Sequence, residues 1–443
     1  MPKVIKIKKG LNIPLTGEAS GPIVRDSYTR IFGIVPDDYP GYKWKAAVKD
    51  GDDIAAGAPL LFAKEDEKIK LVSPVAGKVI TVKRGERRKI EYVSVEASDT
   101  QNPMVKVSAA NADDIIAALK ETGLFSMLRQ RPFDMVPFMA GLPRDIFVTA
   151  FDTAPLAGEI IKPEDKSNLE SGLKILSGLT SGKVYLSVKA GSGITSATAE
   201  VFEFEGPHPA GNVGVQIAKI KPINKGEFVW TLNAATAVRI GKLFSDGILD
   251  FSTTVAITGP EVKSPHFVQT LIGASIKSLI GDNLKKDGKP RVISGDVLTG
   301  KQVDPEDGFL RYPYRQITVI PEGDTADEFM GWASLNPAKY SVKHSFPTFL
   351  HKLGKPFNFD ARIRGGHRAM ILSNEYDKVF PFDIYPEYLI KAIMAKDIEK
   401  MEQLGIYEVA PEDFALPEFV DTSKIELQKI VRQGLDYLRQ ETI

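Results

Sequence analysis

Residues 205–214 read EGPHPAGNVG and separate the alternating run VFEFEG from the apolar stretch VQIAKI. Alternation predicts a β-strand and the apolar stretch that follows predicts a helix, so the turn joins a strand to a helix. Glycines at such a junction let backbone amides approach a phosphate closely. Because glycine also builds ordinary tight turns, this turn alone does not identify a nucleotide site.

The neighbouring segments extend this strand-and-helix alternation. Strands are expected at 145–151 and 183–191, and helices at 112–122, 168–179 and 233–247. Asp113 and Asp114 suit the first turn of a helix, while Asn233 and Gly247 suit the two ends of another. Strands that alternate with helices predict a Rossmann-like α/β domain, which we place at residues 105–250.

The other segments predict three further domains. Short β-branched runs make residues 1–104 a β domain, and DGDDIAAGAPLLFAKEDEKIKLVSPVAGKVITV at 50–82 has the pattern of a barrel-sandwich hybrid, the fold of lipoyl and biotinyl carriers. Lys64 and Lys68 match neither carrier signature, so we expect a structural use of that fold. Residues 251–320 are similar to a β-grasp domain of the SLBB type. Residues 321–443 are expected to form a helical domain that ends in a helix with regularly spaced apolar positions, at Leu427, Ile430, Val431, Leu435 and Leu438.

Composition limits the function. Lys plus Arg and Asp plus Glu both number 57 in 443 residues, so we expect no general nucleic-acid binder. No run approaches the roughly 18 apolar residues of a membrane span, and the start lacks a signal cleavage site; we therefore expect a soluble cytoplasmic protein. The chain has no cysteine, which excludes disulfides and thiolate-bound iron–sulfur clusters. The five histidines lack paired zinc-site spacing, and Pro347 interrupts the segment between His344 and His351, so no metal site is expected.

Two segments are candidate binding sites. Residues 129–143, RQRPFDMVPFMAGLP, gather Phe133, Phe138 and Met139 between prolines and beside arginines. A quinone is a flat apolar ring with carbonyl acceptors, and a pocket walled by aromatic and thioether side chains with a donor nearby would suit it. The alternative is that these residues pack the interface between two domains. The other segment is basic and carries Arg362, Arg364, His367 and Arg368 around a Gly-Gly pair. It predicts a patch for an anion, a lipid headgroup or a partner protein.

Three motifs resemble the NqrA family, subunits of the sodium-translocating NADH:quinone reductase: KKGLNIPLTGE at 8–18, GPHPAGNVG at 206–214, and RAMILSNEYDKVFPFDIYPEYLIKAI at 368–393. The architecture is also similar to RnfC and to the flavin-carrying subunit of complex I. The resemblance implies a peripheral subunit on the cytoplasmic side of the bacterial inner membrane, with the subunits NqrB and NqrC as partners. The complex would use NADH, flavins, iron–sulfur clusters and a quinone to drive Na⁺ export.

Comparison with the flavin-carrying relatives implies that this chain binds no redox cofactor itself and has no complete active site. Their loop GxGGAGFP corresponds here to LFSMLRQRPFDMVP at 124–137, whose bulky residues obstruct approach to a phosphate. Their acidic GAExEP turn corresponds to FDTAPLAGE, which keeps Pro155. Their YPxGE turn corresponds to His208, Pro209, Gly211 and Asn212, with Asn212 in place of the acid, so we interpret it as a vestigial cofactor turn. The alternatives are an electron-transfer subunit like RnfC and a scaffold without a ligand.

Overall fold

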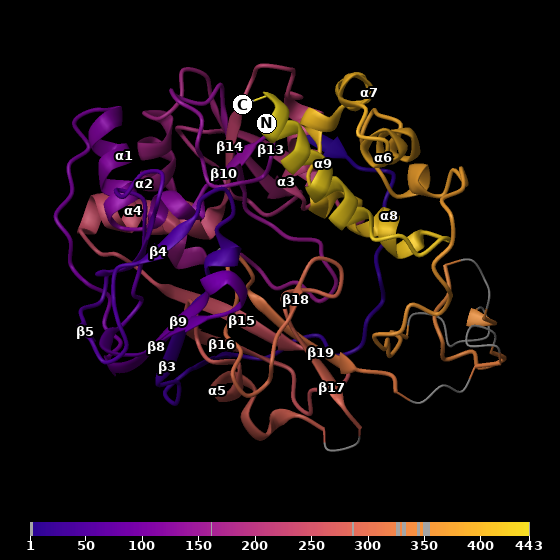
Figure 1. Ribbon diagram of the computed structural model, residues 1–443, viewed down its shortest axis with the longest axis horizontal. Helices are drawn as coiled ribbons and strands as arrows, with labels where there is room; N and C mark the ends of the chain where they lie inside the picture. Colours follow the sequence, from indigo (N-terminus) through magenta and orange to yellow (C-terminus); the bar gives the residue numbers. More distant parts are fainter. Residues whose placement is uncertain are drawn as a thin grey trace.

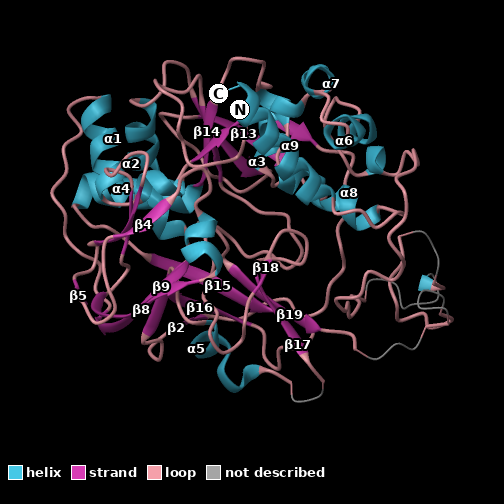
Figure 2. Cartoon of the chain, viewed as in Figure 1, coloured by secondary structure: helices cyan, strands magenta, loops and turns pink. Residues whose placement is uncertain are grey.

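The computed structural model describes residues 3–160, 162–285, 288–324, 328–329, 334–342, 346–348 and 355–442. Figure 1 shows the C-terminal helices beside the strands β13 and β14 of the α/β domain, while the strands of the N-terminal and β-grasp domains lie together below. Figure 2 shows the same view with helices in cyan and strands in magenta. The fold combines a barrel-sandwich hybrid, an α/β domain, a β-grasp sheet and C-terminal helices, as the sequence predicts.

The α/β domain is built on a sheet of strand order β1-β13-β12-β11-β14-β10. Neighbouring strands are parallel, except that β10 runs antiparallel to β14. The strands are β1 (Lys3–Lys6), β10 (Arg129–Arg131), β11 (Ile146–Thr149), β12 (Val184–Lys189), β13 (Glu200–Glu205) and β14 (Val229–Asn233). The helices are α1 (Ala112–Glu121), α2 (Lys166–Ser177), α3 (Val213–Ile220) and α4 (Ala234–Asp246).

Local capping signals explain where the predicted helices begin and end. The Asn233 side chain accepts a hydrogen bond of 2.9 Å from the Thr236 amide, and Gly247 ends α4 with a φ of 69°. Asn111 caps α1 through the Asp114 amide, and Asp113 and Asp114 lie in its first turn. The caps predicted for α4 and the acidic first turn predicted for α1 are therefore confirmed.

The N-terminal β domain contains two sheets, of order β3-β9-β8-β5 and β4-β6-β7. Lys64 and Lys68 are exposed between β6 and β7 of the second sheet. The strands of the two sheets are β3 (Ile31–Ile34), β4 (Trp44–Ala46), β5 (Asp53–Ile54), β6 (Pro59–Ala63), β7 (Lys70–Val72), β8 (Ala76–Arg84) and β9 (Ile90–Asp99). The chain preceding them belongs to other sheets, because β1 pairs with β13 of the α/β domain and β2 (Ile23–Arg25) pairs with β16 of the β-grasp domain.

The β-grasp sheet has the order β18-β17-β19-β15-β16-β2, and the C-terminal helices follow it in the chain. The sheet is formed by β15 (Ser252–Thr258), β16 (His266–Leu271), β17 (Pro290–Ser294), β18 (Lys301–Gln302) and β19 (Gln316–Pro321), with the short helix α5 (Ile276–Ile280). The C-terminal helices are α6 (Pro386–Met394), α7 (Ile398–Gln403), α8 (Ala415–Val420) and α9 (Leu427–Thr442).

Two hydrophobic cores lie on opposite faces of the α/β sheet. Ile146 and Val148 of β11 belong to a core shared with the N-terminal and β-grasp domains, while Phe147 belongs to a core shared with the C-terminal helices. Successive residues of a strand point to opposite faces, so β11 contributes to both cores. The predicted apolar positions of α9 fit this arrangement, because Leu427, Val431, Leu435 and Leu438 are buried in the second core.

Helices α2 and α4 pack through two glycines. A Cβ atom on Gly172 would overlap the Ala237 carbonyl oxygen, and one on Gly241 would overlap the Asn168 carbonyl oxygen. The two backbones therefore approach more closely than helices with side chains at these positions could.

Gly172→Ala should lower the free energy of unfolding by about 1–3 kcal/mol, because the added methyl group forces the helices apart. Alanine is intrinsically about 1 kcal/mol better than glycine within a helix, so any loss must come from packing. Urea unfolding of this variant and of Lys174→Ala, at an exposed position of α2, measures the effect. Equal stability of Gly172→Ala and the wild type would contradict the close approach.

Candidate functional site

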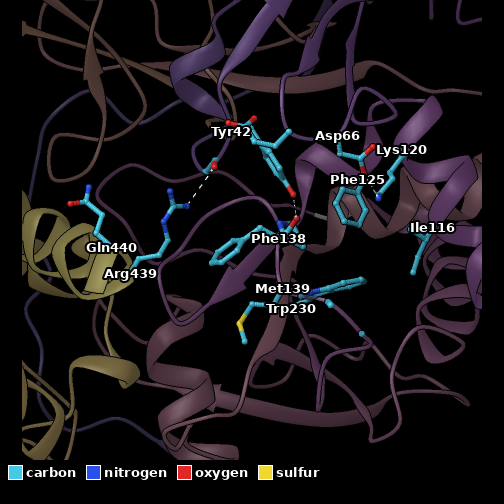
Figure 3. A pocket seen from close by; sticks show the side chains of 15 residues that line it. Tyr42, Asp66, Ile116, Lys120, Phe125, Phe138, Met139, Trp230, Arg439 and Gln440 are labelled. Carbon is cyan, nitrogen blue, oxygen red and sulfur yellow. Dashed lines mark hydrogen bonds and ion pairs between the residues drawn. The ribbon is translucent and has the colours of Figure 1, made fainter. Parts of the chain in front are cut away.

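The loop after β10 reaches a cavity of about 650 Å³. Phe138 and Met139 line it together with residues from distant parts of the chain: Tyr42 from the N-terminal domain, Trp230 from β14 and Arg439 from α9. Figure 3 shows Phe138 lying between Tyr42, Arg439 and Trp230. The cavity therefore lies where the N-terminal domain, the α/β domain and the last helix meet.

Hydrogen bonds hold the cavity side of this loop in place. The Phe138 and Met139 amides donate to Oε1 of the buried Gln130, at 3.3 and 3.1 Å. The Tyr42 hydroxyl donates to the Pro137 carbonyl at 2.7 Å. The guanidinium of Arg439 lies over the Phe138 ring, 5.2 Å from its centroid. The loop thus presents Phe138 from a fixed backbone, with a cation on one face of its ring.

The opposite end of the cavity carries an ion pair. Nζ of Lys120 lies 2.7 Å from Oδ2 of Asp66 and also lies over the Phe125 ring. Burial raises the pKa of Asp66, but hydrogen bonds from the Lys120 side chain and the Lys68 amide outweigh it and leave the pKa below its usual value. Burial, followed by the Asp66 and Glu65 charges, raises the pKa of Tyr42 to about 12. The cavity therefore combines aromatic walls with the Arg439 guanidinium, the Lys120–Asp66 ion pair, the acidic residue Glu65 and a neutral hydroxyl.

Phe133, the third residue predicted to contact a quinone, does not line this cavity. It is 2% exposed in the core shared with the C-terminal helices, and its ring centroid lies 5.9 Å from that of Phe138. Arg129 is also engaged elsewhere, because its guanidinium donates to the carbonyl groups of Asp38, Ser126 and Leu128. The quinone role of Phe133, Phe138 and Met139 stays a prediction.

The turn at 205–214 joins β13 to α3 and packs against the N-terminal segment. The His208 amide donates to Oδ1 of Asn12 at 2.9 Å, and the Leu11 amide donates to the His208 carbonyl at 2.8 Å. Nδ1 of His208 lies 3.1 Å from Oγ1 of Thr153, which also accepts a hydrogen bond from the Gly211 amide. The turn is therefore tied to two neighbouring segments of the chain.

Pro209 and Gly211 are buried in this turn, and Asn212 precedes α3 without forming a side-chain cap. The first turn of α3 instead faces a carboxylate, because a Cβ atom on Gly214 would overlap the side chain of Asp413. A helix N-terminus favours an acidic group, and here the chain itself places a carboxyl group there, from the segment before α8.

Arg131 joins this carboxylate to the α/β sheet. Its guanidinium is 2% exposed and lies 2.6 Å from Oε1 of Glu412, 3.3 Å from Oδ2 of Asp413 and 3.4 Å from Oδ1 of Asp134. Burial raises the pKa of the Asp413 carboxyl, and Arg131 opposes that rise. The loop that begins in β10 thus supplies a cation that binds the C-terminal domain.

The predicted basic patch is divided between paired and exposed groups. Arg362 and Arg364 both form ion pairs with Glu328 and with Asp360. His367 and Arg368 are exposed, and the Arg368 amide donates to the Ser423 carbonyl at 2.9 Å. The predicted role of this patch in binding an anion or a partner stays a prediction.

Neither a cluster of metal ligands nor a membrane-spanning helix occurs among the residues that the structure describes. The described ranges contain no group of three or more acidic or histidine side chains that could hold a metal ion. His344 and His351 lie outside them. No helix in the described part of the chain is both long and apolar enough to cross a membrane.

Together these features define a multidomain α/β protein whose turn at 205–214 packs against other segments of the same chain, and which has a cavity where the N-terminal domain, the α/β domain and the last helix meet. Family models match three consecutive segments: the "NqrA N-terminal barrel-sandwich hybrid domain" at residues 5–98, the "NqrA second alpha/beta domain" at 110–249 and the "NQRA C-terminal domain" at 254–304. The chain is 35% identical over 452 residues to the NqrA subunit of the Na⁺-translocating NADH-quinone reductase of Pasteurella multocida (strain Pm70), with 99% of this chain and 100% of the relative covered.

The same subunit of Vibrio parahaemolyticus (serotype O3:K6, strain RIMD 2210633) is 35% identical over 449 residues, which cover 99% of this chain and 100% of that protein. The chain therefore belongs to the NqrA family. Among solved structures, an NAD⁺-reducing [NiFe]-hydrogenase in the air-oxidized state aligns with a TM-score of 0.37 and 13% identity, over 77% of this chain and 63% of that one. A TM-score of this size supports no conclusion about function.

Several cavity residues carry no local sign of their role in the sequence. Tyr42, Trp230 and Arg439 come from segments that meet only in the folded chain. Aromatic and basic residues such as these occur in any globular protein. Only their proximity in the folded chain identifies them as a candidate site.

The His208 ring should make stability depend on pH. The side chain is 3% exposed and burial lowers its pKa to about 4, although the charge of Asp296 opposes this. In the unfolded chain a histidine takes up its proton near pH ~6.5. The unfolded state therefore binds more protons between these values, and the free energy of unfolding should fall as the pH is lowered through this window.

Urea unfolding at about pH 7 and about pH 5 tests this for the wild type, for His208→Gln and for His367→Gln, which changes an exposed histidine. His208→Gln should lose less stability on acidification than the wild type, and His367→Gln should behave like the wild type. If His208→Gln loses as much as the wild type, then His208 is not the group responsible.

Proposed function

We propose that this chain is a peripheral subunit of a Na⁺-translocating NADH:quinone reductase, on the cytoplasmic side of the bacterial inner membrane. It would associate with the membrane-bound subunits NqrB and NqrC in a complex that couples NADH oxidation and quinone reduction to Na⁺ export. The observation that carries this proposal is 35% identity to NqrA proteins along essentially the whole of both chains.

The geometry of the vestigial turn supports a role without a redox cofactor bound by this chain. A flavin phosphate at the start of α3 would meet the Asp413 carboxyl group, whose oxygen atoms already fill the space beside Gly214. Arg131, the cation that could offset such a phosphate, is already bound to Glu412 and Asp413. NADH, the flavins and the iron–sulfur clusters of the complex would accordingly be held by other subunits.

The junction cavity supports a contact with quinone. Its volume of about 650 Å³ is ample for a small planar headgroup. Phe138 and Trp230 offer ring faces, while the Lys120 ammonium and the Arg439 guanidinium are donors that could bind quinone carbonyl oxygens. A scaffold that binds no ligand is the alternative, and quinone binding separates the two.

Affinity purification of the tagged chain from mildly solubilised membranes tests the assignment to the complex. The chain should co-purify with the other subunits, NqrB and NqrC among them, and the preparation should show Na⁺-stimulated NADH:quinone reductase activity. A chain recovered alone, from membranes in which that activity resides in other fractions, would refute the proposal. Mass spectrometry and the activity assay are read on the same fractions.

Replacing Phe138 by Ala should weaken binding of a short-chain ubiquinone analogue by about 10-fold, because a ring contact is lost. Phe138 is half-buried, so stability should fall by less than the about 3–5 kcal/mol expected for Phe133→Ala in the core. Equilibrium binding and thermal unfolding are measured on both variants, with Phe329→Ala, at an exposed phenylalanine, as the control. Unchanged binding per folded Phe138→Ala molecule would show that this ring does not contact quinone.

A further inference from the structure

A second, small cavity lies where the α/β domain meets the β-grasp domain. Its volume is about 20 Å³, and the residues that line it include Arg239 from α4, Arg311 and Arg315. A space of about 10–15 Å³ is enough for one water-sized particle. The cavity therefore has room for a single small species, such as a water molecule or a monatomic ion, and none for a phosphate group.

Only one of the three arginines has its charge neutralised within the described chain. Arg311 binds Asp38 with Nε 2.9 Å from both carboxylate oxygens. Arg239 donates instead to the carbonyl groups of Asp250 and Ser252, at 3.1 and 2.8 Å. Arg315 donates from Nη1 to the Ile160 carbonyl, at 2.7 Å.

The two remaining guanidiniums are partly or fully withdrawn from solvent without a carboxylate in direct contact. Arg239 is 5% exposed, and Nε of Arg315 is buried without a hydrogen-bond acceptor among the described residues. Burial, and then the neighbouring charge of Arg239, lower the pKa of Arg315 to about 10, with Asp165 and Asp152 opposing the shift. Arg239 is buried and Arg315 is half-buried, and neither forms a direct ion pair among the described residues. Two such cations repel each other and are costly to hold together unless an anion lies near both.

We propose that this cavity binds one monatomic anion, chloride under ordinary conditions, between Arg239 and Arg315. The cavity size excludes larger anions, the lining arginines Arg239 and Arg315 supply two positive charges without a direct ion pair in the described chain, and Nε of Arg315 supplies an unused donor. The anion bridges α4 of the α/β domain and the segment that leads into β19, so it holds the β-grasp sheet against the α/β domain.

Thermal unfolding in sodium chloride and in sodium gluconate, at equal sodium concentration and ionic strength, tests this site. The wild type should unfold about 2–4 °C higher in chloride, because an ion that binds only the folded state stabilises it. Arg315→Met should lose this dependence, and it should be no less stable than the wild type in gluconate because it removes one of two repelling cations. Arg291→Met changes an arginine that is paired with Glu322, and it should keep the chloride effect.

Equal unfolding temperatures of the wild type in the two salts, or a chloride effect in Arg315→Met as large as in the wild type, would overturn the proposal. Crystals of the wild-type chain soaked in sodium bromide give a second measurement that does not depend on a variant. Anomalous density within hydrogen-bond distance of Arg239 and Arg315 is the expected result. A cavity without an anomalous peak at high bromide concentration would overturn the proposal independently.

Discussion

The guanidinium of Arg131 is buried between the edge strand of the α/β sheet and carboxylates that follow it by 281 and 282 residues in the chain. A buried charge that loses a partner costs several kcal/mol, about 3–5 in measured cases, so the burial of Arg131 requires the carboxyl groups beside it, those of Glu412 and Asp413 and that of Asp134 in its own loop. This requirement keeps the segment before α8 on the α/β domain. The second hydrophobic core, which contains residues of both parts, forms around the same contact.

The same contact affects whether the α/β domain can bind an anion at the start of α3. Asp413 faces the start of α3, the position at which a strand-turn-helix unit ordinarily offers its amides to an anion. The turn before α3 is held by Leu11 and Asn12, which belong to another of the motifs that resemble the NqrA family. Two motifs that are far apart in the sequence therefore form one structural unit, and the turn serves as an anchor for the N-terminal segment.

Local sequence signals predict many of the helices and strands. The features that the sequence does not predict depend on long-range contacts. Asn233 and Gly247 mark the ends of α4 because capping involves only the adjacent turn. The membership of β1 in the α/β sheet depends on pairing with β13, nearly two hundred residues later, and nothing within Lys3–Lys6 specifies that partner. In the same way, the sequence presents Arg131 as an obstruction to a phosphate but does not reveal its carboxylate partners.

The loop of the candidate site also contains residues whose environment local sequence does not predict. Phe133 and Phe138 have the same side chain and similar neighbours, but the first is buried in the core and the second faces the cavity. Their difference arises from long-range contacts, because Arg439 of α9 and Tyr42 of the N-terminal domain both contact the Phe138 end of the loop. A ligand in the cavity would touch Tyr42, Trp230 and Arg439 together, so it would bind well only while these parts of the chain keep their arrangement. Binding there would therefore depend on the docking of the C-terminal domain, to which Arg131 contributes.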